Sequence, residues 1–174
     1  FVFLKAFIAI PLQWFCSAWT AYNLLILATF TLAGYGMFLL ARHLTGDSRA
    51  AWVAGLVYAF SPYMLTRGLG HLNYLSGEWI PLYALCLIRL LETRERRWAV
   101  GGGLCLLLTA YCEYYYLIYL TMFTAFYLGW RFWRDKAVVI DRAFLGPFAL
   151  MGGIAVVGFA PILWMLLGTA QSGY

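Results

Sequence analysis

One glutamate stands between two long apolar runs in the second half of the chain. Glu113 lies in the segment TAYCEYYYLIY, whose other residues are apolar, aromatic or uncharged. If these runs cross a membrane, an acid between them is costly unless it faces a cavity or a partner. A carboxylate in that setting can act as a general base or hold a cation, so Glu113 is the candidate catalytic residue. The alternative is a solvated turn in which interfacial tyrosines flank the acid.

A second group of polar residues lies in the glycine-containing stretch TRGLGHLNYLSGEW. Its arginine and histidine can bind the phosphate of a lipid-linked substrate through charge-assisted hydrogen bonds, with anchoring at the membrane interface as an equal alternative. The candidate substrate-binding residues are Arg67, His71, Asn73 and Glu78. For Glu78 the preferred interpretation is stabilisation of a helix start behind an N-cap at Ser76. His71 with Asn73 is too small a set for a metal site.

Positive charges occur in three clusters separated by strongly apolar sequence. Ten of the 12 Lys and Arg residues fall within residues 42–49, 89–97 and 131–142. Basic loops of polytopic membrane proteins face the cytoplasm, so we expect these three loops to be cytoplasmic. Loops 64–78 and 110–114 are then extracytoplasmic. All the candidate residues fall on this outer side together with Lys5, and the acidic residues of the basic loops are interpreted as solvated charges.

The apolar runs predict an all-α, polytopic transmembrane helix bundle of about six spans. The first covers residues 22–41, and the second starts at residue 50 and ends between residues 63 and 66, with a break near Ser61 and Pro62. The third starts after Ser76 and ends at Glu92. These lengths suit a hydrocarbon core about 30 Å thick.

The stretch 98–130 is too long for one of these spans. As a single helix it would rise about 50 Å. It would also put two basic clusters on opposite sides of the membrane, so we expect two short spans with a turn near residues 110–113. The last span covers residues 144–167. Residues 1–19 are predicted to form an interfacial or re-entrant segment, with a seventh crossing as the alternative.

The composition excludes several classes of protein. The chain is 64% hydrophobic and 11% charged, far from the composition of soluble domains. The net charge of +5 reflects topology, because no basic face is interleaved with aromatic residues for nucleic acid. The four cysteines lack a CxxC spacing, and we expect no metal and no cofactor. Glycines 101–103, with Gly34 and Gly36, indicate close helix packing.

Several segments together resemble a known superfamily of membrane enzymes. They are AYNLL, LARHLTG, AGLVYAFSPY, GHLNYLSGEWIPL and CEYYYLIYL, which lie within residues 22–133. In these segments the chain resembles bacterial GT-C type membrane glycosyltransferases and their YfhO-like relatives. The resemblance covers about two thirds of the sequence and indicates the superfamily more than any one activity.

The resemblance implies transfer of a sugar from a polyprenyl-phosphate donor to an acceptor on the extracytoplasmic face of the bacterial inner membrane. Membrane lipids and this donor are the implied partners. In such enzymes the main catalytic carboxylate follows the first transmembrane helix. We therefore expect residues 1–174 to be one transmembrane domain within a longer protein, with that carboxylate upstream. The alternatives are a transporter or channel subunit, and a non-catalytic membrane subunit of a larger complex.

Overall fold

The computed structural model describes residues 3–68, 70 and 75–171. Within these ranges the ordered elements are α-helices, and no β-strand occurs. The helices are α1 (Phe3–Leu12), α2 (Ala18–Thr45), α3 (Ser48–Ala59), α4 (Pro62–Gly68), α5 (Trp79–Thr93), α6 (Arg96–Cys112), α7 (Tyr114–Arg134), α8 (Lys136–Ile140) and α9 (Arg142–Gln171). The all-α prediction is therefore confirmed for the described part of the chain.

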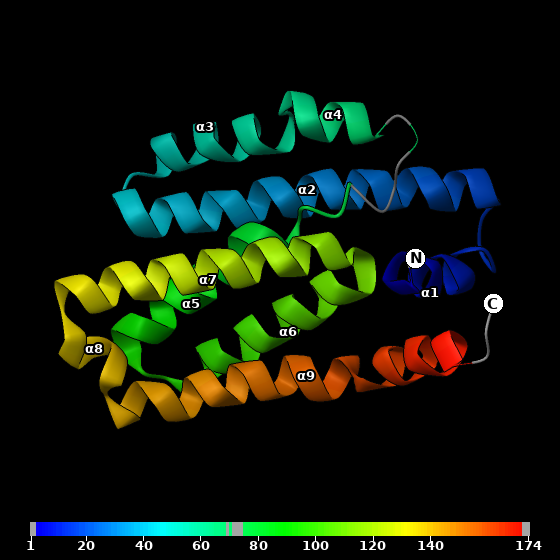
Figure 1. Cartoon of the computed structure of the whole chain (residues 1–174). Coiled ribbons are helices and arrows are strands. Elements are labelled where there is room, and N and C mark those ends of the chain that lie inside the picture. Colours follow the sequence, from blue (N-terminus) through cyan, green and yellow to red (C-terminus); the bar gives the residue numbers. More distant parts are fainter. Residues whose placement is uncertain (1–2, 69, 71–74, 172–174) are drawn as a thin grey trace.

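Successive long helices run in opposite directions along the bundle (Figure 1). Helix α2 runs one way, α3 and α4 return, and α5, α6, α7 and α9 continue the alternation. The turn between α2 and α3 shows why the chain reverses where it does. Gly46 ends α2 with φ 72°, its N–H bonding the Arg42 carbonyl, and the Asp47 side chain then caps α3 by accepting from the Arg49 N–H. Gly46 and Asp47 thus fix the end of α2 and the start of α3.

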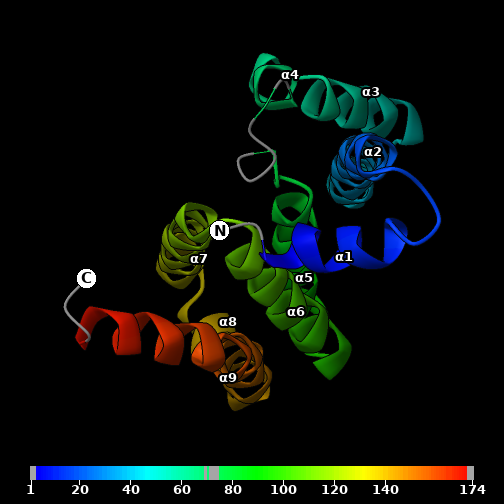
Figure 2. The same cartoon turned by 90° about the vertical axis from the view of Figure 1, so that its right-hand side faces the viewer.

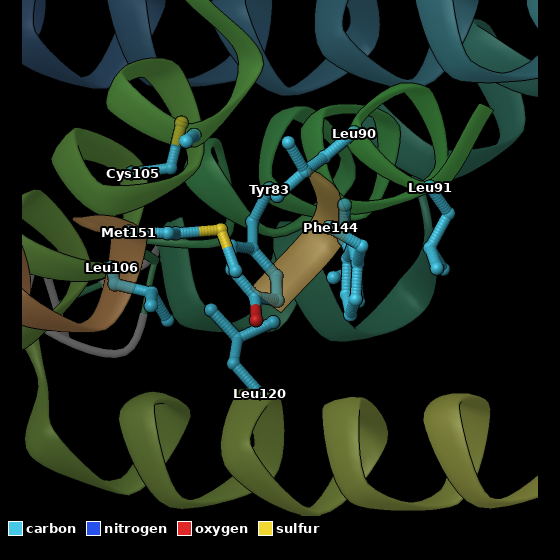
Figure 3. Packing of buried hydrophobic residues seen from close by; sticks show 10 residues of the cluster. Tyr83, Leu90, Leu91, Cys105, Leu106, Leu120, Phe144 and Met151 are labelled. Atoms are coloured by element: carbon cyan, nitrogen blue, oxygen red, sulfur yellow. The ribbon is translucent and has the colours of Figure 1, made fainter. Parts of the chain in front are cut away.

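The core lies where α5, α6, α7 and α9 meet (Figure 3). Helix α5 contributes a buried stripe that includes Tyr83, Leu87 and Leu90, whose spacing follows the helical period. The Tyr83 hydroxyl is 2.5 Å from the Thr124 hydroxyl of α7, so the one polar group of this stripe is satisfied. Side chains from α6, α7 and α9 complete the cluster with Leu106, Leu120, Phe144 and Met151.

Glycine allows the closest helix contacts. A Cβ on Gly103 of α6 would lie 2.8 Å from the Met151 carbonyl oxygen of α9. A Cβ on Gly55 of α3 would lie 2.7 Å from the Gly34 carbonyl oxygen of α2. Real Cβ atoms do not approach so closely, and the interpretation of Gly34 and Gly103 as close-packing residues is confirmed.

Within the described residues, two helices are long and apolar enough to cross a membrane: Ala18–Thr45 and the Arg142–Ile162 part of α9. Only 28% and 11% of their most apolar stretches are buried within the molecule. The core helix of a soluble protein would be mostly buried, so these open apolar surfaces are compatible with membrane association.

The predicted count of six spans is not supported by the other helices. The second predicted run is divided at Ser61 into α3, with 12 residues, and α4, with 7. Helices α5 and α6 have 15 and 17 residues, which rise about 23–26 Å against a hydrocarbon core of about 30 Å. Helix α7 has 21 residues, but its tyrosines and threonines lower its hydropathy. The break predicted within residues 98–130 is confirmed, because α6 ends at Cys112 and α7 begins at Tyr114.

The N-terminal helix does not run with the others. Helix α1 lies across one end of the bundle, crosswise to α2 (Figure 2), and contacts α2 and α6. Its ten residues rise about 15 Å, which is half the thickness of a hydrocarbon core. It is therefore too short to form the seventh crossing.

Candidate functional site

The two ends of the bundle differ in charge. The end formed by the α2–α3 and α5–α6 turns, by α8 and by the helix termini beside it carries all three basic clusters (Figure 1). We call it the arginine end. The opposite end, where α1, residues 75–78 and the α6–α7 junction meet, is called the Glu113 end. The predicted site residues of the described chain all belong to the Glu113 end.

An ion pair is buried at the Glu113 end. The Lys5 Nζ atom of α1 lies 3.6 Å from Oε1 of Glu78, and each residue is only 3% exposed. Burial lowers the pKa of Lys5, an effect that the Glu78 carboxylate opposes. Burial likewise raises the pKa of Glu78, and the Lys5 ammonium opposes that rise. The second carboxylate oxygen, Oε2, is buried without a hydrogen-bond partner.

The predicted helix-start role of Glu78 is wrong in detail. Helix α5 begins at Trp79, so Glu78 itself takes the N-cap position, and its side chain makes no capping bond. Ser76, predicted as the N-cap, lies three residues before α5 and is fully buried. The Glu78 carboxylate turns instead to a buried cation, because an unpaired ammonium at that depth would cost more than an unmade cap.

Glu113 is the single residue between α6 and α7. Its backbone is extended, with φ −158° and ψ 114°. Its N–H bonds the Thr109 carbonyl at 2.8 Å, and its carbonyl accepts from the Tyr116 N–H at 3.2 Å. The residue is only 5% exposed, so the alternative of a solvated turn is wrong. The Cys112 side chain beside it is fully buried.

Tyrosines connect this junction to Arg67. The hydroxyls of Tyr63 and Tyr116 are 2.7 Å apart, and the Arg67 guanidinium carbon lies 5.4 Å from the centre of the Tyr63 ring. The half-buried Arg67 in the last turn of α4 is therefore joined through two side chains to the first turn of α7. A third tyrosine, Tyr58, donates to the Gly77 carbonyl at 2.9 Å, next to Glu78.

The structure thus brings Arg67, Glu78 and Glu113 to one end of the molecule, although their contacts form a chain and not a single cluster around one point. His71 and Asn73 lie outside the described residues. Sequence reasoning missed the tyrosines and the pairing of Lys5. A signal for Lys5 was present, because it is the only charged residue among the first 41.

An apolar groove lies between α2 and the α3–α4 pair. Its volume is about 640 Å³, and it is lined by residues that include Phe30, Tyr35, Trp52, Phe60 and Leu65. None of the predicted site residues lines it, but its last residue, Leu65, is two positions before Arg67. Across the described ranges, no group of three His, Cys, Asp or Glu side chains is placed to hold a metal ion.

The fold and the two ends define a helical protein whose described part has two helices long and apolar enough to cross a membrane and has charged residues buried at one end. The chain belongs to the family described as Domain of unknown function (DUF6311), which matches residues 3–174. No curated protein and no solved structure matches the chain.

Proposed function

We propose that this domain is the membrane-embedded part of a glycosyltransferase that takes a sugar from a polyprenyl-phosphate donor and works at the extracytoplasmic face. One observation carries the proposal: Arg67, Glu78 and Glu113 share the end of the bundle opposite to the ten basic residues of the arginine end. With basic loops in the cytoplasm, the Glu113 end faces outward, where polyprenyl-linked sugars are used.

In this arrangement α2, α3 with α4, α5, α6, α7 and α9 form six crossings of the bacterial inner membrane. The short α5 and α6 suit this arrangement if their outer ends stop below the membrane surface. A break at that depth is tolerated only where protein or a watery cavity surrounds it, and Glu113 at the α6–α7 break is only 5% exposed. Helix α1 and the turn after it then lie in the outer interface, with Phe7 of the helix 65% exposed and Trp14 of the turn 78% exposed toward lipid.

Two features suit a lipid-linked donor. The groove of about 640 Å³ between α2 and α3–α4 has an apolar lining and would accommodate part of a prenyl chain. Arg67 stands just beyond its outer end, where a cation can bind the phosphate at the end of the chain. Glu113 would accept a proton or a hydrogen bond from the reacting sugar or acceptor. Glu78 holds α1 over this end through Lys5.

The test is transfer of labelled sugar by the full-length protein in proteoliposomes that contain polyprenyl-phosphate sugars. We expect Glu113→Gln to lower turnover by about 100-fold, as for loss of a general base, and Arg67→Gln to raise the KM for the donor. Arg97→Gln, which removes the same charge as Arg67→Gln but at the arginine end, is the matched control and should leave both unchanged. Absence of transfer with every donor, or unchanged kinetics in both site variants, would refute the proposal.

A further inference from the structure

The whole net charge of the chain belongs to the arginine end. That end holds ten basic and five acidic side chains, whereas the Glu113 end holds two of each. The excess of five positive charges is therefore concentrated within one end of the molecule. Such an end attracts phosphate groups, and its individual donors show where a phosphate would bind.

Arg94 occupies an unusual backbone position in this end. It ends α5 with φ 61°, and no other non-glycine residue in the described ranges has a positive φ. Glycine is the favoured residue at such a helix end, so an arginine here points to a role for its side chain. That side chain donates from Nη2 to the Val138 carbonyl at 2.8 Å, and its guanidinium carbon lies 5.2 Å from the centre of the Phe144 ring.

Two donors beside the α5–α6 turn lack acceptors. Nη1 of Arg94 and Nε1 of Trp98, in the first turn of α6, are both buried without a hydrogen-bond partner. Two further cations lie near the Trp98 ring, with the guanidinium carbons of Arg89 and Arg97 at 5.1 and 5.4 Å from its centre. A buried N–H without an acceptor is costly, and the common remedy is a bound anion or water.

The nearby acidic groups do not fill this need. Asp141 lies 3.8 Å from Nε of Arg94, on a different nitrogen from the unpaired one. Glu92 is engaged by His43 at 3.0 Å and by Arg89 at 3.5 Å. Glu95 is paired with Arg97. The carboxylates around the turn are thus used, and the two donors remain.

We propose that the α5–α6 turn binds the phosphate of an anionic phospholipid, with Arg94 Nη1 and Trp98 Nε1 as donors to its oxygens. The Arg94 side chain is 22% exposed, so a headgroup can reach the guanidinium after a small rotation of the side chain. The apolar Trp133 and Ile140, 83% and 57% exposed on the neighbouring α7 and α8, suit the same lipid interface. This site requires that the chain spans a membrane, but it does not require the proposed sugar transfer.

The experiment measures binding of phosphatidylglycerol, presented in detergent micelles, to the full-length protein, with phosphatidylcholine, whose phosphate is balanced by a cationic choline, as the comparison without net charge. Arg94→Gln and Trp98→Phe should each weaken binding about tenfold, as expected for loss of a hydrogen bond to a charged group. Trp98→Phe removes only the donor and keeps an aromatic ring near Arg89 and Arg97. Arg49→Gln removes the same charge at the same end, from an exposed position at the α2–α3 turn, and should change the affinity by less than about twofold.

Each outcome decides the proposal. Equal weakening in Arg49→Gln would show diffuse attraction and overturn a site at this turn, and so would unchanged binding in both site variants. Inorganic phosphate is tested as a competitor at equal concentration. Competition as strong as that of the lipid would show a site for free phosphate instead. If Arg94→Gln does not fold, Arg94→Gly replaces it, since glycine suits the positive φ.

Discussion

The ammonium group of Lys5 and the carboxylate of Glu78 lie 3.6 Å apart, with only 4% of either side chain exposed. Lys5 belongs to α1, and Glu78 directly precedes α5. The pair therefore holds the crosswise N-terminal helix against the bundle. Two charges buried in this way gain their mutual attraction only after both have lost their hydration. The intact pair therefore adds little to the stability of the fold, whereas removal of one member destabilises it strongly.

We expect Lys5→Met and Glu78→Gln each to lower the free energy of unfolding by about 3 kcal/mol, because either change leaves a buried charge alone. The double variant should lie much closer to the wild type. Denaturant unfolding of the detergent-solubilised protein measures all four members of this cycle. A double variant as unstable as the sum of the two single variants would contradict the role of the pair.

The same pair predicts a pH dependence of stability. Burial raises the pKa of Glu78 above 4.5, so between 4.5 and the raised pKa the folded carboxyl keeps a proton that the unfolded one loses. Stability therefore falls as the pH rises through that window. Burial lowers the pKa of Lys5 below 10.5, so between the lowered pKa and 10.5 only the unfolded amine is protonated. Stability rises with pH through that second window.

Melting midpoints across the pH range should thus show a minimum between the two windows. The double variant Lys5→Met with Glu78→Gln removes both titrations and serves as the reference curve. If the wild-type curve stays parallel to this reference from acid to alkaline pH, neither group titrates differently in the folded protein, and the prediction is wrong.

The contact of α6 with α9 gives a prediction about packing. Gly103→Ala would put a methyl group 2.8 Å from the Met151 carbonyl and 2.9 Å from the Ile154 Cβ, so we expect a loss of about 1–3 kcal/mol. Gly129→Ala in α7 is the control, because no neighbouring atom lies within 4 Å of the position that its methyl group would take. That change should stabilise the helix by about 0.5 kcal/mol. Equal melting midpoints for the two variants would show that α6 and α9 do not pack this closely.

The tyrosines between Arg67 and Glu113 allow two effects to be separated at one position. Tyr63→Phe keeps the ring 5.4 Å from the Arg67 guanidinium and removes only the hydroxyl bonded to Tyr116, at an expected cost of about 1 kcal/mol. Tyr63→Leu also removes the cation–π contact, which adds about 0.5–1 kcal/mol. The difference between the unfolding free energies of the two variants measures the contact with Arg67. A difference near zero would show that Arg67 gains nothing from the ring.

The helices and their alternating direction could be predicted from local features of the sequence. The exact helix lengths and the side-chain contacts between helices could not. The charge clusters and the length of the run 98–130 predicted the break that the structure places at Glu113. The count of six spans depended on hydropathy and charge, but α5, with 15 residues, rises only about 23 Å against a hydrocarbon core of about 30 Å. Helix length depends on where capping and tertiary contacts end the helix, which a hydropathy pattern does not contain.

The candidate site shows the same division. Glu113 and Arg67 could be singled out because charges in apolar sequence are conspicuous, and Lys5 has that property too. Its partner could not be found, because Lys5 and Glu78 are joined only through the crosswise docking of α1. The tyrosine hydroxyl pair likewise joins α4 to α7, and no spacing within either segment indicates it.

The one-residue junction at Glu113 has a consequence for how the chain length can vary. Each residue added to a helix turns the rest of that helix by about 100° around its axis. With only Glu113 between α6 and α7, an added or lost residue has no loop to absorb it. The buried side chains of α7, Tyr116 and Leu120, would then rotate away from their partners. Turns at the end of a helix bundle commonly tolerate insertions. The α6–α7 junction lies at such an end, yet we expect it to tolerate neither an added nor a lost residue.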